Sequence, residues 1–150
     1  MRESQVILIV DDNHGDYEAA VRSLRKARIG NPIVHCEDGD QTLDYLHHRG
    51  RYSDPASAPR PGVILLDLNL PGTDGRDILA EVKGDPSLRS IPVIVLTTSS
   101  DERDVERCYA LGANSYMKKR LDLQEFMQAI QRMSDFWLEI ALLPSGEEQP

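Results

Sequence analysis

The chain has 150 residues, of which 40% are apolar and 28% are charged, and these values exclude a fully disordered chain. This length is sufficient for one domain whose core needs neither disulfides nor metals. The 17 basic and 25 acidic residues give a net charge of −8, which argues against direct nucleic-acid binding.

The chain shows no sign of membrane insertion or secretion. No apolar run approaches the roughly 18 residues of a transmembrane helix, and the N-terminal MRESQVILIVDD lacks the layout of a signal peptide. Neither the two cysteines, Cys36 and Cys108, nor the four histidines show a metal-ligand spacing. We therefore expect a cytoplasmic protein with no membrane partner.

Five short runs rich in apolar residues alternate with helical patterns. The runs span Val6–Val10, Ile33–Cys36, Val63–Leu66, Val93–Leu96 and Asn114–Lys118. The first four are continuous instead of alternating, which is typical of strands buried on both faces. The pattern predicts an α/β fold of the flavodoxin-like (βα)5 type, a doubly wound five-stranded parallel sheet in the order 2-1-3-4-5.

The helices are predicted from apolar spacing and capping residues. The first is expected after Asp12, with Tyr17, Ala20, Val21 and Leu24 on one face, and the others over residues 39–49, 77–83 and 101–111 and from 123 onward. Ser99 and Glu102 have the spacing of a capping box before the fourth helix, and Asp122 caps the last one. We expect a single domain over residues 1–143 with no output domain, followed by a disordered tail over 144–150.

Polar side chains follow four of the predicted strands where each strand ends. Asp11 and Asp12 follow the first strand and Asp67 the third. Thr97 follows the fourth strand, and Lys119 the fifth. Ligands of such sheets bind at the carboxyl ends of the strands, at the switch point between strands one and three. The fold therefore brings three carboxylates together.

Close carboxylates repel each other, by about 4 kcal/mol at 4 Å and an effective dielectric constant of 20. Mg²⁺ can neutralise them because it takes oxygen ligands and retains waters. Asp67 could then act as a nucleophile toward phosphorus, with Lys119 and Thr97 offsetting the charge of the phosphoryl group. Each motif alone could be a cap or a turn, but their coincidence at four strand ends favours one functional site.

The motifs ILIVDDN, ILLDLNLPGTDG, IPVIVLTTS and SYMKK resemble the receiver domain of two-component response regulators over residues 5–133. The resemblance implies a phospho-accepting signalling protein instead of an enzyme with its own substrate. Its implied site comprises Asp67 as phospho-acceptor, Asp11, Asp12, Asp67 and the Asn69 carbonyl as Mg²⁺ ligands, Lys119 as the phosphoryl partner, and Thr97 and Tyr116 as switch residues. Arg76 is expected to be only a solvated charge at the start of a helix.

One departure from the family pattern concerns the fifth strand. The family has Lys-Pro there, often with a cis peptide, whereas Lys119 is followed by Arg120. A cis bond before a non-proline residue costs about 3–4 kcal/mol, so the peptide is either trans in a rearranged loop or strained. A structural adaptor that is not phosphorylated remains an alternative. A magnesium-dependent phosphatase is a weaker one, because the stretch after Asp67 lacks the second acid of a DxDx[TV] motif.

A narrower resemblance links the chain to single-domain regulators paired with bacterial phytochrome histidine kinases. It rests on DLNLPGTDGRDILAEVKGDPSLRSIPVIVLTTS, on the ending FWLEIALLP and on the Pro-containing segment 50–61. It implies a bacteriophytochrome kinase as phosphoryl donor, and the chain has no nucleotide-binding motif of its own. The signal would leave by contact or relay from the face formed by helix four, strand five and helix five.

The last predicted helix carries an apolar stripe longer than one small sheet needs. The stripe is Leu123, Phe126, Ile130, Met133, Trp137 and Ile140. We expect Phe136, Trp137 and Ile140 to form a homodimer interface, since an exposed apolar patch usually marks a partner site. The alternative is that this segment folds back onto its own domain.

Overall fold

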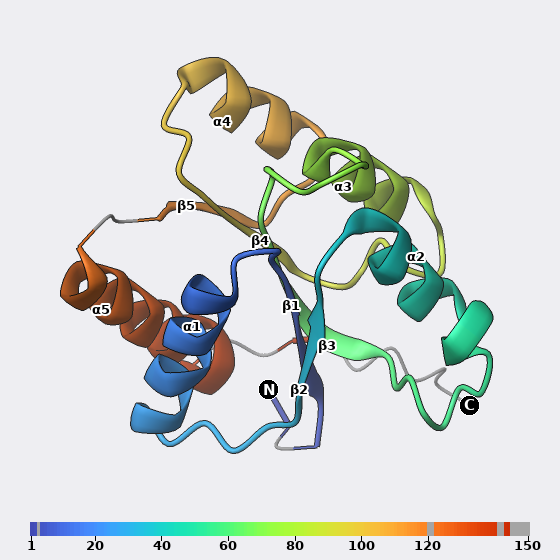
Figure 1. Cartoon of the computed structure of the whole chain (residues 1–150), viewed down its shortest axis with the longest axis horizontal. Helices are drawn as coiled ribbons and strands as arrows, with labels where there is room; N and C mark the ends of the chain where they lie inside the picture. Colours follow the sequence, from blue (N-terminus) through green and yellow to red (C-terminus); the bar gives the residue numbers. More distant parts are fainter. Residues whose placement is uncertain (3, 120–121, 141–142, 145–150) are drawn as a thin grey trace.

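The computed structural model describes residues 1–2, 4–119, 122–140 and 143–144, without the side chains of 139 and 140. It contains a five-stranded parallel sheet in the order β2-β1-β3-β4-β5, with helices on both faces (Figure 1). The predicted fold class and strand order are therefore confirmed. Residues 145–150 of the predicted tail lie outside the described residues.

The observed elements follow the predicted ones closely. The strands are β1 (Val6–Val10), β2 (Ile33–Cys36), β3 (Pro61–Leu66), β4 (Val93–Thr97) and β5 (Ser115–Lys118). The helices are α1 (His14–Lys26), α2 (Gly39–His47), α3 (Gly75–Gly84), α4 (Glu102–Ala110) and α5 (Leu123–Ser134), with a 3₁₀ turn η1 (Gly50–Tyr52) and a π-helical segment η2 (Asp135–Ile140). Among the described residues, no helix is long and apolar enough to cross a membrane.

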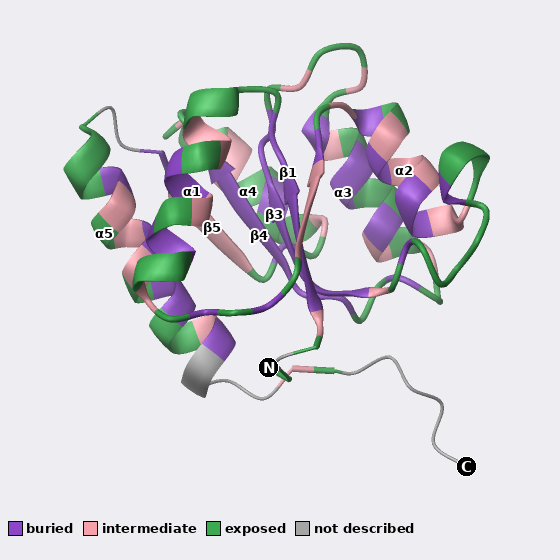
Figure 2. Cartoon of the chain, turned by 60° about the horizontal axis from the view of Figure 1, so that its bottom comes forward, coloured by how far each residue is buried: buried purple, intermediate pink, exposed green. Residues whose placement is uncertain are grey.

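The apolar runs are continuous because each central strand packs side chains into two hydrophobic cores, one on each face of the sheet. In β1, Leu8 and Val10 pack into the core beneath α2, α3 and α4, whereas Ile7 and Ile9 pack into the core beneath α1 and α5. Every residue of β1, β3 and β4 is buried, and the helices turn their exposed residues outward (Figure 2). The sheet is thus rigid at its centre, where the polar strand ends emerge.

The predicted capping box before the fourth helix is wrong. The N-cap of α4 is Asp101, whose carboxylate accepts the backbone N–H of Arg103. Ser99 instead donates its hydroxyl to Asp104 at 2.8 Å. At α5 the prediction is confirmed, because Asp122 accepts the backbone N–H of Glu125 at 2.9 Å. A carboxylate two residues nearer to α4 takes the capping role from Ser99.

The last helix changes its winding after Ser134. Phe126, Ile130 and Met133 are buried as predicted, but Leu123 at the start of the stripe is 55% exposed. In η2 the wider π winding interrupts the apolar spacing, so that Leu138 is buried while Phe136 is 53% exposed. The segment therefore folds back in part and leaves one aromatic ring toward solvent. The side chain of Ile140 lies outside the described part.

Gly75 allows α3 to begin against the end of β3. A Cβ atom at this position would lie 2.5 Å from the backbone oxygen of Asp67 and 2.6 Å from Cα of Leu68, both rigid backbone atoms. The closeness of this approach explains why the sequence needs glycine here. It also ties the loop after Asp67 to the helix that follows it.

We expect Gly75→Ala to lower the free energy of unfolding by about 1–3 kcal/mol, since the added methyl group overpacks this contact. Gly84→Ala at the other end of α3 is the matched control, because a Cβ there meets no atom within 4 Å. The control should leave stability unchanged or raise it by up to about 1 kcal/mol. Urea denaturation measures both, and equal effects would contradict the close-approach argument.

Candidate functional site

Three carboxylates meet at the carboxyl edge of the sheet. Asp11 and Asp12 follow β1, and Asp67 follows β3, the strand paired with β1 in continuous register from Ile7 to Val10. One carboxylate oxygen from each residue lies within 4.8 Å of the other two. Asp11 and Asp67 are buried, whereas Asp12 is exposed. The structure thus brings together the three acids expected from their positions at strand ends.

Lys119 neutralises part of this charge from the end of β5. Its ammonium Nζ lies 2.6 Å from Asp11 Oδ2 and 3.1 Å from Asp67 Oδ2. The side chain is only 5% exposed, and burial by itself lowers the pKa of Lys119. The hydrogen bond and charge of Asp11, together with Asp67, more than offset this effect and raise the pKa above its ordinary value. Lys119 therefore remains protonated in the site.

Lys119 has a third partner that the sequence did not indicate. Asp16 in the first turn of α1 places Oδ2 at 3.0 Å from Nζ. No strand end marks Asp16, and only the packing of α1 beside the site brings it there. The following residue, Arg120, and the peptide bond before it lie outside the described residues, so the predicted departure from the Lys-Pro geometry stays an expectation.

Asp67 is held in one orientation and has an altered acidity. Burial raises its pKa above the ordinary 3.8, while the charge of Lys119 and the N–H of Asn69 lower it by less. The backbone N–H of Asn69 donates to Oδ1 at 3.2 Å, and Lys119 donates to Oδ2 at 3.1 Å. Each carboxylate oxygen of Asp67 thus has a fixed donor.

The donor set fits a hard divalent cation. Asp11, Asp16 and Asp67 contact the ammonium of Lys119, and Asp12 lies beside Asp11 and Asp67, so four carboxyl groups share one cation. Carboxylate oxygens are the ligands that Mg²⁺ prefers, and the exposure of Asp12 leaves room for the waters that Mg²⁺ retains. We therefore regard the three strand-end acids as able to hold such an ion.

Thr97 and Asn69 connect the acids to the loop after β4. Thr97 is fully buried, and its Oγ1 accepts the side-chain N–H of Asn69 at 3.4 Å and the backbone N–H of Ser99 at 3.5 Å. Tyr116 on β5 is half-buried against the core, and its hydroxyl donates to the Ser99 carbonyl at 2.9 Å. The two residues predicted to switch together are thus joined through Ser99.

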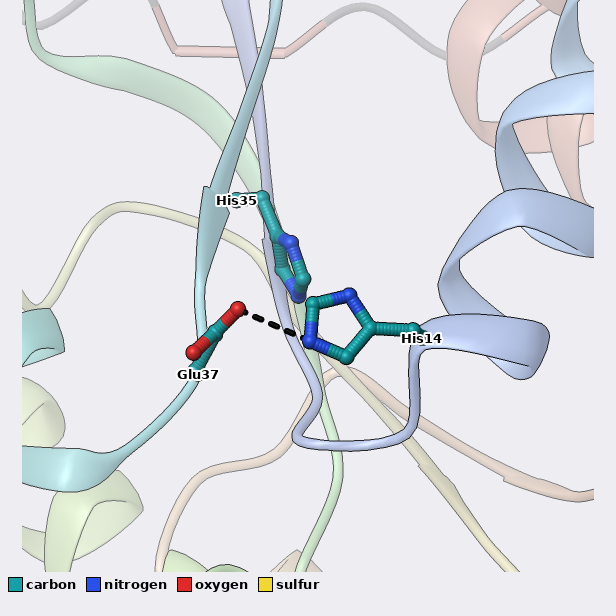
Figure 3. A group of neighbouring side chains, drawn as sticks. All are labelled: His14, His35 and Glu37. Atoms are coloured by element: carbon teal, nitrogen blue, oxygen red, sulfur yellow. Dashed lines mark ion pairs between the residues drawn. The ribbon is translucent and has the colours of Figure 1, made fainter.

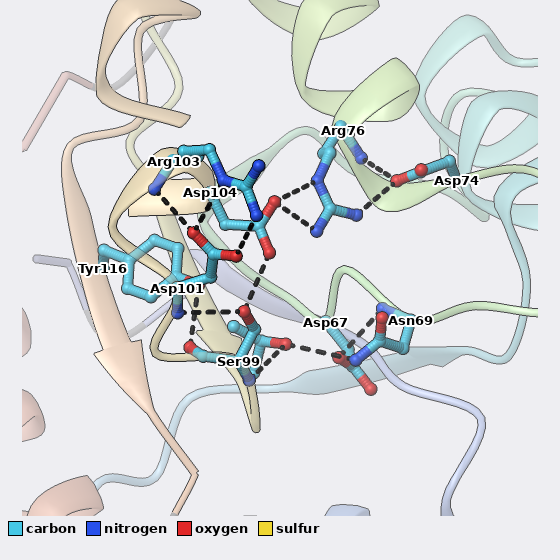
Figure 4. Close-up of polar contacts among 10 residues, drawn as sticks. Asp67, Asn69, Asp74, Arg76, Ser99, Asp101, Arg103, Asp104 and Tyr116 are labelled. Carbon is cyan, nitrogen blue, oxygen red and sulfur yellow. Dashed lines mark hydrogen bonds and ion pairs between the residues drawn. The ribbon is translucent and has the colours of Figure 1, made fainter. Parts of the chain in front are cut away.

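Arg76 is not the solvated charge expected from the sequence. Its side chain is 14% exposed and forms ion pairs with Asp74 at 3.0 Å and with Asp104 at 2.7 Å. Asp104 in turn accepts the hydroxyl of Ser99 at 2.8 Å. Figure 4 shows this chain of contacts running from the start of α3 across α4 to the loop beside the site. Arg76 and Asp104 are 28 residues apart, so helical spacing could not pair them.

The fold and site together define a receiver-type signalling domain, and comparison with known sequences agrees. Residues 7–131 match the response regulator receiver domain family. The chain belongs to this family.

Similar proteins with closely matching length extend the comparison. The chain is 40% identical over 142 residues to the response regulator Rcp1 of Synechocystis sp., covering 95% of each chain. The structure of the Mn²⁺-bound form of Rcp1 is similar with a TM-score of 0.88 and 41% identity, covering 93% of this chain and 99% of that one. The structure of the phosphorylated cyanobacterial phytochrome response regulator RcpA is similar with a TM-score of 0.89 and 41% identity, covering 95% of this chain and 99% of that one. Membership of the predicted family is therefore confirmed, as is the resemblance to phytochrome-linked single-domain regulators.

We expect Arg76→Gln to lower the free energy of unfolding by about 1–3 kcal/mol at neutral pH, because it leaves two carboxylates without their partner. Arg103→Gln is the matched control, since Arg103 pairs with Asp101 at a similar 3.1 Å but is 91% exposed. The control should show no measurable change. Chemical denaturation of both variants measures the difference.

The loss of stability in Arg76→Gln should depend on pH. The hydrogen bonds from Arg76 and Ser99 lower the pKa of Asp104 below 3.8. A depressed folded-state pKa stabilises the fold above the unfolded value, and this contribution is lost as the pH falls through the folded value. The deficit of Arg76→Gln should therefore be complete at pH 7 and shrink below pH 3.8. A deficit independent of pH would contradict the ion-pair explanation.

Proposed function

We propose that Asp67 accepts a phosphoryl group from a phosphohistidine of a partner histidine kinase. The observation that carries this proposal is the buried Asp67 carboxylate 3.1 Å from the ammonium of Lys119, inside a group with excess negative charge. The phosphorylated state of the similar protein RcpA supports it. The chain acts as a response regulator whose own chemistry is limited to this transfer and to hydrolysis of the aspartyl phosphate, which restores the carboxylate and releases inorganic phosphate.

The chemistry follows from the groups present. A carboxylate oxygen of Asp67 forms a P–O bond while the P–N bond to the partner's imidazole breaks and its electron pair returns to nitrogen. Lys119 and the Thr97 hydroxyl would stabilise the charge of the transferred phosphoryl group. Asp11, Asp12, Asp67 and the carbonyl of Asn69 would hold Mg²⁺, which supplies further charge neutralisation when bound.

We propose a phytochrome-type histidine kinase as the donor. The similar RcpA is a cyanobacterial phytochrome response regulator. A second similar structure, with 42% identity and a TM-score of 0.71, is the bacteriophytochrome response regulator AtBRR, of which the chain covers 99%.

We expect wild-type protein incubated with acetyl phosphate and Mg²⁺ to show a retarded band on a phosphate-affinity gel. Asp67→Asn should show none, because it lacks the nucleophilic carboxylate. Asp77→Asn is the matched control, since Asp77 is an exposed carboxylate on α3, and it should shift like wild type. Chelation of Mg²⁺ should abolish the shift. A shift that persists in Asp67→Asn would disprove the assignment, and failure of wild type would favour the adaptor alternative.

Phosphorylation is proposed to change the face formed by α4, β5 and α5. The loop after Thr97 is joined to Tyr116 by the 2.9 Å bond to Ser99 and to α4 by the bond from Ser99 to Asp104. A phosphoryl group that draws the Thr97 hydroxyl toward it therefore pulls on both β5 and α4. The result is a shift between two packings of this face.

We also propose that a second copy of the chain binds at the end of α5. Phe136 is 53% exposed beside a hollow of about 590 Å³. Met117, Ala129, Met133, Phe136 and Trp137 line it, together with polar residues of β5 and α5. β5 is the last strand of the sheet, so this apolar hollow lies at an open edge. The side chain of Ile140, the third predicted interface residue, lies outside the described part.

We expect Phe136→Glu to convert a dimer to a monomer, or to weaken it by more than about tenfold, since the charge would be buried in an apolar contact. Leu123→Glu is the matched control, because Leu123 is similarly exposed at 55% on the same helix but away from the hollow. Sedimentation equilibrium measures both. Dissociation by Leu123→Glu alone would place the interface elsewhere.

A further inference from the structure

A second group of metal-ligating side chains lies beside the acidic site. His14 begins α1, His35 is the third residue of β2, and Glu37 follows the end of β2. One possible ligand atom from each lies within 4.8 Å of the other two. From the sequence the histidines showed no metal spacing, and the fold brings these two together because α1 starts next to the carboxyl end of β2.

The geometry of this group suits a metal ion that approaches from solvent. His14 Nε2 lies 3.1 Å from Glu37 Oε1, and the rings of His14 and His35 meet edge to face with centroids 5.7 Å apart (Figure 3). Adjacent ligands of a tetrahedral zinc ion are about 3.3 Å apart, given metal–ligand bonds of about 2.0–2.1 Å. One of the three pairs is therefore already at ligand separation, and the two distances to His35 are within 4.8 Å.

The three residues differ in mobility in a way that favours binding. The ring of His35 is fixed by stacking on Tyr17, with centroids 3.7 Å apart and planes 6° apart. The side chains of His14 and Glu37 are 70% and 52% exposed, so they can rotate to close on an ion. Their exposed ion pair contributes little stability of its own, so replacing it with metal bonds is favourable.

The chemistry of the donors separates this group from the acidic site. Two imidazoles and one carboxylate are ligands for zinc and similar borderline ions, whereas the carboxylates of Asp11, Asp12 and Asp67 suit Mg²⁺. We propose that His14, His35 and Glu37 form a binding site for a divalent transition-metal ion such as Zn²⁺, separate from the Mg²⁺ site.

Binding changes one contact inside the protein. His35 Nε2 lies 2.7 Å from the backbone oxygen of Asp11 and donates its proton to it in the metal-free chain. A metal ion bound to this nitrogen requires the other neutral tautomer of His35, in which the proton is on Nδ1, so the hydrogen bond to Asp11 is lost and no proton leaves the ring. The ion at this site therefore acts on the backbone of Asp11, whose carboxylate belongs to the acidic site.

The test is calorimetric titration of the full chain with Zn²⁺ in the presence of excess Mg²⁺, which keeps the acidic site filled. We expect one Zn²⁺ per chain that Mg²⁺ does not displace. His14→Ala and Glu37→Gln should each weaken binding by more than about tenfold. Both replace exposed side chains, and thermal melting checks their folding.

His47→Ala is the matched control. His47 also lies beside carboxylates, 3.2 Å from Glu81 and 3.9 Å from Asp85, but within the described part of the chain no second imidazole joins this group. It should bind Zn²⁺ like wild type. His35→Phe keeps an aromatic ring against Tyr17 and removes the nitrogen ligand, so it should lose binding. Unchanged affinity in His14→Ala, an equal loss in His47→Ala, or displacement of Zn²⁺ by Mg²⁺ would each overturn the proposal.

Discussion

The buried ammonium of Lys119 between Asp11 and Asp67 is the contact on which the site depends. Two carboxylates buried at neighbouring strand ends repel each other in a medium of low dielectric constant, and the nearby cation offsets that repulsion. Removal of Lys119 or of one carboxylate would be destabilising, because it would leave an unbalanced buried charge. The sheet makes this arrangement possible, since β1, β3 and β5 all deliver their polar ends to one edge.

Two sets of contacts extend from the acidic site, one made by side chains and one made through the backbone of Asp11. Toward α3 and α4, a hydrogen-bonded chain passes from Thr97 through Ser99 to Asp104 and Arg76. Toward β2, the backbone oxygen of Asp11 reaches the ring of His35. Charge at the site is therefore felt by side chains on both halves of the molecule. An isolated acidic cluster on a loop would lack such connections.

Some residues of the site could be predicted from the sequence, and others could not. Asp11, Asp67, Thr97 and Lys119 could be placed together because each directly follows an apolar run, and strand order then determines which ends meet. Asp16 could not be found in this way, since its position depends on how α1 packs in space. The same holds for the pairing of Arg76 with Asp104. The N-cap of α4 was also predicted wrongly, because two nearby side chains can cap this helix and Asp101 does so instead of Ser99.

The position of Lys119 late in the chain has a consequence for synthesis. β1 leaves the ribosome early, yet its partner β3 begins only at Pro61, and Lys119 follows later still. Until that residue emerges, any compact nascent form must hold Asp11 and Asp67 together without their cation. Their repulsion disfavours such a form when no divalent cation is bound, so we expect the compact sheet to gain stability when the last strand delivers Lys119.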